Sequence, residues 1–148
     1  MLRLIIMPRK SLDLAITDLA ESIALLLRRV RAAAASDELS WSEIAVLKRL
    51  AKDGPSTTAD LARAQGMKPQ SMRTIVSSLG QLSMVERKPH PTDGRQVNLE
   101  LTPKGAALEK HAADAKRTWF AQAIAQLDKP DRETLFAAGE IFKRLAEK

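Results

Sequence analysis

The sequence contains no cysteine, which excludes structural disulfides, thiol redox sensing and cysteine-ligated zinc. Its two histidines, His90 and His111, lie far apart, with no acidic cluster between them. We therefore expect no metal site and no resident cofactor. Tyrosine is also absent, so no phenolic hydroxyl is available to line a ligand pocket.

Long hydrophobic runs are missing as well. The N-terminus contains only a four-residue apolar stretch, too short for the core of a signal peptide, and no later segment approaches the length of a membrane span. A cytoplasmic protein that does not enter a membrane is expected. Met7, followed by Pro8-Arg9-Lys10, is a second candidate for the translation start besides Met1.

No pattern in the sequence supports catalysis. There is no nucleophile paired with a positioned base, no glycine-rich phosphate loop and no metal-ligand cluster. The sequence therefore predicts a binding protein that is not an enzyme.

Positive charge is concentrated away from the C-terminal part of the chain. The net charge of +6 admits nucleic acid, an anionic membrane or an acidic protein as partner. Residues 61–104 contain seven basic side chains against three acidic ones, whereas residues 105–148 contain eight against seven. The basic excess thus falls on the middle of the chain and on the N-terminal segment.

Apolar periodicity predicts a mainly helical chain, with helices over about 12–35, 41–53, 60–64, 69–82, 103–127 and from 129 onward. Ser11 is placed to cap the first helix, Ser40 and Glu43 form a capping box on the second, and Thr57 or Thr58 caps the third. The first helix is apolar over a wide arc, so at least two of its faces need cover.

Between residues 84 and 101 the apolar residues no longer follow helical spacing, and in the second half of this segment they alternate with polar residues. Two strands are expected over 84–88 and 96–101, and Asp93-Gly94 is a strong hairpin signal between them. Val97, Leu99 and Leu101 should form the buried face of the second strand. A short helix, a turn, a second helix and a hairpin predict a winged helix-turn-helix, with a small wing of two to three strands.

The helix over 69–82 divides into an apolar stripe and a polar face. The polar face is formed by Gln70, Ser71, Arg73, Thr74 and Ser77. Short or hydrogen-bonding side chains suit a helix that enters the major groove and meets base edges. On periodicity alone, a solvated helix face explains these residues equally well.

The hairpin favours the DNA-binding interpretation. Lys88 and Arg95 flank its turn, and an arginine on a rigid arm suits a narrow minor groove or a phosphate. Asp93 is placed either to hold Arg95 by a salt bridge or simply to form the turn.

Five short motifs follow one another between residues 39 and 105. They are Gly54-Pro55, Asp60-Leu61-Ala62, Val85-Glu86-Arg87, Asp93-Gly94-Arg95 and Leu101-Thr102-Pro103-Lys104-Gly105. In this combination, and without a gap, the segment resembles the MarR family of winged helix-turn-helix transcription regulators. Three features depart from the family pattern. Ser83 stands where glycine is usual, and Gly80 lies inside the helix over 69–82, which we call the reading helix. Arg73-Thr74 inverts the commoner order, in which a hydroxyl residue precedes an arginine.

The resemblance implies a homodimer in which helices from residues 1–38 and 105–148 interlock, while residues 39–104 bind a pseudo-palindromic operator in double-stranded DNA. It implies a repressor released by a small-molecule effector, often a phenolic or other aromatic compound. DNA contacts then fall on the polar face of the reading helix, on Lys68 at a phosphate, and on the wing residues Lys88, Asp93 and Arg95.

Two questions stay open at this point. Trp41, Trp119 and Phe120 either line an effector pocket or belong to the core or dimer interface. The chain is also compatible with a winged-helix module of the anti-repressor type, which binds another protein and not DNA.

Overall fold

A computed structural model of the chain describes residues 9–148, so the candidate start at Met7 lies outside the described residues. Residues 9–148 form helices and one hairpin, in the order α1 (Arg9–Ala33), α2 (Trp41–Asp53), α3 (Thr58–Ala64), α4 (Pro69–Gln81), β1 (Val85–Pro89), β2 (Val97–Leu101), α5 (Pro103–Ala125) and α6 (Lys129–Ala146). The expectation of a mainly α-helical winged fold is confirmed. None of the described helices is long and apolar enough to cross a membrane.

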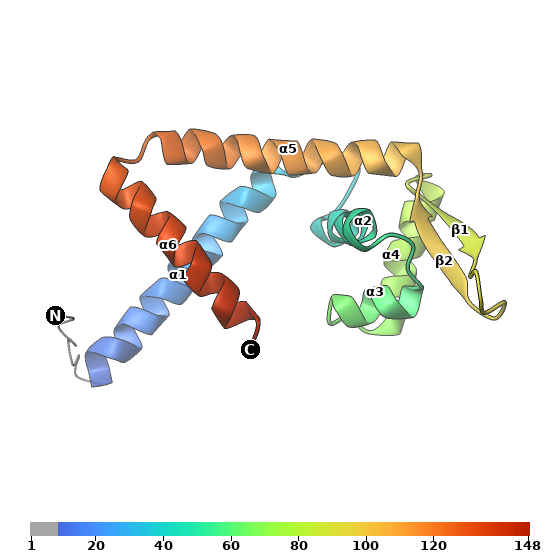
Figure 1. Cartoon of the computed structure of the whole chain (residues 1–148), viewed down its shortest axis with the longest axis horizontal. Helices are drawn as coiled ribbons and strands as arrows, with labels where there is room; N and C mark the ends of the chain where they lie inside the picture. The colour runs from blue at the N-terminus through green and yellow to red at the C-terminus, as the bar shows by residue number, and fades with distance from the viewer. Residues whose placement is uncertain (1–8) are drawn as a thin grey trace.

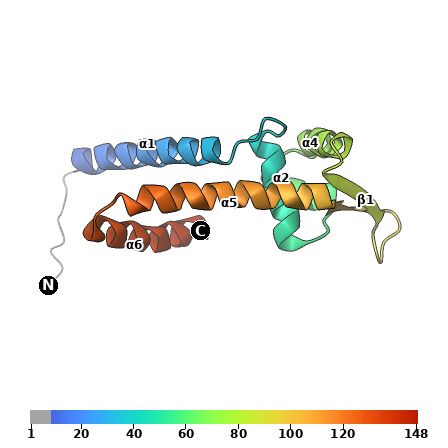
Figure 2. The ribbon, with the colours of Figure 1, turned by 90° about the horizontal axis from the view of Figure 1, so that it is seen from above.

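The long helix α5 connects two parts of the molecule. At its N-terminal end, α2, α3, α4 and the β1–β2 hairpin form a lobe, and at its other end lie α1 and α6 (Figure 1). The ribbons of α1 and α6 cross in that view, but Figure 2 shows that they lie on opposite sides of α5. Helix α5 contacts both α1 and α2, so it ties the lobe to the remaining helices.

Local capping signals place most helix starts. The predicted capping box is present: Ser40 Oγ accepts from the Glu43 N–H at 3.3 Å, and Glu43 Oε2 accepts from the Ser40 N–H at 3.0 Å. Of the two threonines considered for α3, Thr57 is the cap. The prediction for Ser11 is wrong, because α1 already begins at Arg9 and Ser11 lies inside its first turn.

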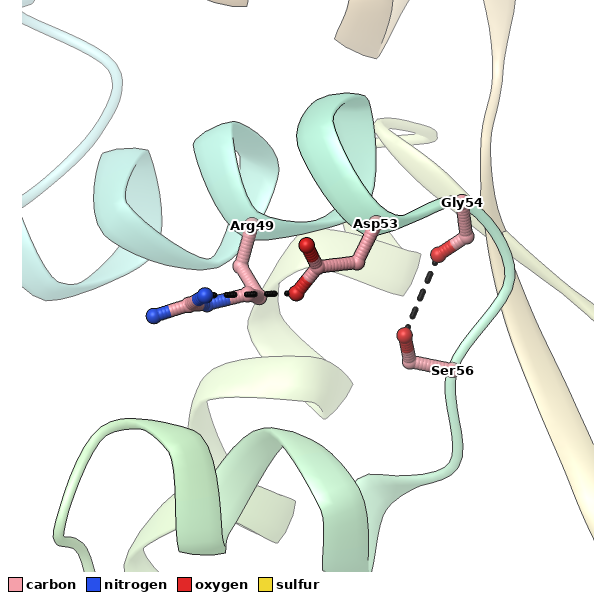
Figure 3. Close-up of polar contacts among 4 residues, drawn as sticks. All are labelled: Arg49, Asp53, Gly54 and Ser56. Carbon is pink, nitrogen blue, oxygen red and sulfur yellow. Dashed lines mark hydrogen bonds and ion pairs between the residues drawn. The ribbon is translucent and has the colours of Figure 1, made fainter.

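The turn after α2 brings a third segment to the hairpin. Gly54 ends the helix with φ +78° and donates its N–H to Leu50 O at 2.9 Å. Figure 3 shows Ser56 donating its hydroxyl to Gly54 O at 3.1 Å, beside the Arg49–Asp53 ion pair at 3.2 Å. Ser56 then exchanges two backbone hydrogen bonds with Leu99, so the third strand of the wing is reduced to a single bridge.

The hydrophobic core lies in the lobe. Its fully buried side chains come from α2, α3, α4 and both sides of the hairpin: Val46, Leu47, Leu61, Met72, Leu79, Met84 and Leu99. One expectation for β2 is wrong: Leu99 is buried and Leu101 half-buried, but Val97 is 46% exposed. Val97 pairs with Pro89 at the far end of the ladder, beyond the reach of the core.

By contrast, α1 and α6 leave their apolar side chains uncovered within the chain. Leu14 is 71% exposed and Phe136 is 60% exposed, and α6 has no buried residue. The uncovered set comprises Leu12, Leu14, Ile16, Leu19, Leu25, Leu26 and Leu27 of α1, with Leu135, Phe136, Ile141, Phe142 and Leu145 of α6. The predicted need of the first helix for cover is therefore not met inside one chain.

Candidate nucleic-acid interface

Helix α4 has one face in the core and one in solvent. Pro69 occupies its first turn, where a missing N–H costs no hydrogen bond, and Met72, Val76 and Leu79 are buried. The opposite side carries the polar face predicted from the sequence, and all five of its residues are exposed: Gln70, Ser71, Arg73, Thr74 and Ser77. Four of them, without Ser71, line one shallow depression together with Ser78 and Gln81.

The amino end of α4 is also accessible. Lys68 is its N-cap residue, exposed, and its side chain makes no capping hydrogen bond. Thr74 donates its hydroxyl to Gln70 O at 3.3 Å, one turn earlier in the helix. The structure therefore brings the predicted reading residues and Lys68 together along one edge of the lobe.

Two side chains from other elements hold α4 in place. Glu43, whose Oε2 serves the capping box of α2, accepts the Ser78 hydroxyl at its Oε1 at 2.9 Å. At the other end, Lys104 donates from Nζ to Leu82 O at 3.1 Å. The reading helix is thus joined to α2 at its last turn, through Ser78, and to the start of α5 just after that turn, at Leu82.

The turn after α4 has an unusual backbone. Ser83 has φ +58°, in the left-handed region that glycine adopts more easily. Thr102 donates its hydroxyl to Ser83 O at 2.6 Å and its N–H to Met84 O at 3.1 Å. These contacts seat the base of the hairpin on the first turn of α5.

Lys88 lies on the wing between two carboxylates. Register places Glu86 directly opposite Glu100, and Lys88 Nζ lies 3.2 Å from Glu86 Oε1 and 2.8 Å from Glu100 Oε2. Hydrogen bonds to Glu100 and then Glu86 raise the pKa of Lys88 above its usual range. The ammonium therefore offsets a repulsive cross-strand pair, and its predicted role as a DNA contact stays a prediction.

The wing tip is a longer loop than a two-residue turn. Residues 90–96 join the strands, and Arg95 is exposed there. Asp93 Oδ1 accepts the backbone N–H of Arg95 at 3.0 Å, so of the two roles considered for Asp93, the structure shows the turn-forming one. His90 Nδ1 accepts from the N–H groups of Thr92 and Asp93, at 3.2 Å and 3.1 Å. Sequence reasoning missed this contact, because histidine is not a usual turn signal.

Asp60, in the first turn of α3, has a pKa below its usual range. The hydrogen bond from Thr57 is the main cause; burial opposes it, and the Arg63 ion pair lowers the pKa further. Negative charge at a helix N-terminus is favourable, so this arrangement stabilises α3 beneath the reading helix.

A cavity of about 340 Å³ lies where α2 meets the end of α1 and the middle of α5. Trp41 and Ile44 contribute to its apolar wall, and four cationic side chains line it, Lys48, Arg49, Lys52 and Lys116, against one acidic residue, Glu109. Burial, followed by the nearby Lys48 ammonium, lowers the pKa of Lys116.

The aromatic residues divide between this cavity and other positions. Trp41 lines the cavity, and the Arg31 guanidinium lies 5.2 Å from its ring centroid. Trp119 and Phe120 instead contact each other edge to face, with ring centroids 5.2 Å apart, and are not among the cavity residues. His111 is exposed on α5.

Comparison with known proteins gives a consistent result. A model of the MarR family matches residues 38–96. An HTH-type transcriptional regulator of Mycobacterium tuberculosis is 34% identical over 131 residues, which cover 88% of this chain and 92% of that protein. An HTH-type transcriptional repressor of the same species is 31% identical over 125 residues, covering 84% of this chain and 85% of the repressor.

Among solved structures, the PcaV transcriptional regulator of Streptomyces coelicolor, in complex with its natural ligand, has a similar fold. Its TM-score is 0.64 at 20% identity, and the match covers 87% of this chain and 89% of that chain. At this identity the likeness extends to the fold alone.

Proposed function

Because the chain belongs to the MarR family of DNA-binding transcription regulators, we propose that it acts as a homodimeric repressor that a small-molecule effector releases from a pseudo-palindromic operator. The family acts by binding DNA, which confirms the expectation that the protein is not an enzyme.

The exposed polar face of α4 is the single observation that best supports specific DNA binding. Gln70 and Arg73 carry the longest hydrogen-bonding side chains on this face, so they read base edges, while Ser71, Thr74 and Ser77 make closer contacts. Lys68 meets a phosphate at the amino end of the helix. Arg95 extends the contact from the wing tip to the minor groove or the adjacent backbone.

Salt dependence tests this function. A DNA contact made through several phosphates weakens by orders of magnitude between low and moderate salt. Arg95→Ala should weaken binding and reduce the salt slope by about one for each protomer, or about two for the dimer. Gln70→Ala and Arg73→Ala should instead change which bases a random-sequence duplex pool retains. If neither random nor genomic duplexes are retained even at low salt, the alternative gains support, namely a protein-binding module of the anti-repressor type.

The dimer is proposed from the uncovered apolar faces of α1 and α6. A monomer would leave those leucines and phenylalanines in water at a cost of about 25 cal/mol for each Å² of apolar surface. A second copy offers the same faces, so a twofold arrangement covers both at once. Half-sites protected by the dimer should then lie about one helical turn apart, near 10 bp.

The effector site is proposed at the cavity beside α2. Its apolar wall at Trp41 and Ile44 suits an aromatic ring, and the excess of cations suits an anionic substituent. The Lys48 ammonium disfavours the charged form of Lys116, so an anion placed between the two side chains relieves that repulsion. Because α2 also holds α4 through Glu43, a ligand that displaces α2 moves the reading helix.

Benzoate and its uncharged isostere benzamide form a matched probe pair. Trp41 fluorescence, measured in a Trp119→Phe background, should respond to benzoate more strongly than to benzamide, and Lys116→Gln should reduce the difference. Lys116 attracts the anion only in its protonated form, so its contribution to benzoate affinity is present below its lowered pKa and is lost as pH rises through it. Equal responses to both probes would contradict the anionic class.

A further inference from the structure

The wing tip has a nearly complete set of backbone hydrogen bonds. The His90 N–H donates to Gln96 O at 3.2 Å, and the Gln96 N–H donates to Asp93 O at 3.0 Å. The Arg95 N–H donates to Asp93 Oδ1 at 3.0 Å. Two further N–H groups, from Thr92 and Asp93, both donate to His90 Nδ1. One imidazole nitrogen therefore accepts two of these five hydrogen bonds of the loop.

The ring takes the place of a backbone acceptor. Pro91 has no N–H and disfavours helical backbone at His90, the residue before it. In an ordinary β-turn the Asp93 N–H would bond to the carbonyl of His90, but here it bonds to the half-buried ring. The loop thus depends on a side-chain acceptor at the position that begins it.

The direction of these bonds assigns a role to each ring nitrogen. Two N–H groups point at Nδ1, so Nδ1 is the acceptor and Nε2 is the ring nitrogen left to donate. We propose that His90 is a positioning residue for DNA binding: its ring holds the wing-tip backbone in the conformation from which Arg95 reaches DNA. The inference rests on the proposed wing contact, because it assigns to His90 the geometry of that contact.

Two isosteric substitutions separate positioning from direct contact with DNA. The Oδ1 of asparagine is as far from the backbone as Nδ1 of histidine and also accepts N–H groups two and three residues ahead. The Nε2 of glutamine lies about as far from the backbone as Nε2 of histidine, and Nε2 is the atom that would donate to a phosphate. His90→Asn therefore preserves the positioning role alone, whereas His90→Gln preserves a direct contact alone.

Affinity is measured by fluorescence anisotropy on the duplex that the wild-type protein enriches from a random-sequence pool. H90A and H90Q should each bind about tenfold more weakly, since two neutral hydrogen bonds are lost, and H90N should stay within about twofold of wild type. The double variant H90A, Arg95→Ala should bind DNA less than about twofold more weakly than Arg95→Ala alone, because His90 acts through Arg95. All variants should keep the far-ultraviolet circular dichroism spectrum of the wild type, because the loop lies outside the core.

A direct readout on the free protein accompanies the affinities. The ¹⁵N resonances of His90 should show an unprotonated Nδ1 and a protonated Nε2, and the Thr92 and Asp93 amide protons should shift in H90A but not in H90N. Rescue of binding by H90Q and not by H90N would overturn the proposal, as would wild-type affinity of H90A. If Arg95→Ala itself binds as tightly as wild type, the proposed wing contact is wrong and the positioning role falls with it.

Discussion

A methyl group added at Gly105 would lie 2.0 Å from the backbone carbonyl oxygen of Met84 and 2.9 Å from its carbonyl carbon. Neither atom belongs to a flexible side chain, so in Gly105→Ala the first turn of α5 and the Met84 backbone must separate by about 1 Å. That movement breaks the hydrogen bond from the Thr102 N–H to Met84 O, now 3.1 Å long. It also disturbs Met84, whose side chain is fully buried in the core.

The expected cost follows from these contacts. Overpacking against backbone costs about 1–3 kcal/mol, a lost hydrogen bond about 1 kcal/mol, and the better helix propensity of alanine returns up to about 1 kcal/mol. The free energy of unfolding should therefore fall by about 1–4 kcal/mol. For a chain of this size the midpoint of thermal unfolding should fall by roughly 2–16 °C. Because the base of the hairpin moves with Met84, DNA affinity should fall as well.

Gly80→Ala is the matched control for this substitution. Gly80 lies inside α4, and a methyl group there would meet no atom within 4 Å. The same chemical change should therefore stabilise the protein by up to about 1 kcal/mol. Circular dichroism melts of both variants and wild type are compared at one protein concentration, since the midpoint of a dimer depends on concentration. Equal or higher stability of Gly105→Ala would refute the steric argument.

Three other substitutions test separate features. Ser83→Gly should raise the free energy of unfolding by about 1 kcal/mol in urea titrations, because glycine adopts the φ of +58° without steric cost; a loss of stability would show that the serine side chain is needed. The double variant Glu86→Gln, Glu100→Gln should bind DNA more tightly at low salt and with a steeper salt slope, since Lys88 is then free to meet a phosphate; unchanged binding would mean that this face of the wing lies away from DNA. Phe136→Glu should give a monomer in light scattering, whereas a monomeric wild type would contradict the dimer.

Much of the fold could be predicted because its signals are local. The capping box at Ser40 and Glu43, the glycine that ends α2 and the proline that opens α4 each act within one helical turn. The apolar stripe of α4 is likewise a property of one helix, so its polar face was assigned correctly as exposed. The prediction that Ser11 caps the first helix is wrong because a serine within the first turn of a helix has the same local sequence features as a cap.

The candidate site was less predictable where its contacts join distant residues. Lys88 was expected to meet DNA, but its carboxylate partner Glu100 lies on the opposite strand and becomes visible only through the register of the hairpin. The cavity could not be predicted from its aromatic residues, since Trp41 lines it while Trp119 does not. Its cations come from α2 and α5, which are far apart in the chain.

The sequence by itself determined the helices, the hairpin, the exposed polar face of α4 and the motif that ends in Gly105, because periodicity, capping and turn chemistry act over a few residues. Tertiary structure alone decided why Gly105 cannot carry a side chain and that Glu100 lies beside Lys88. Both depend on the approach of segments separated along the chain, and neither distance is a property of the local sequence.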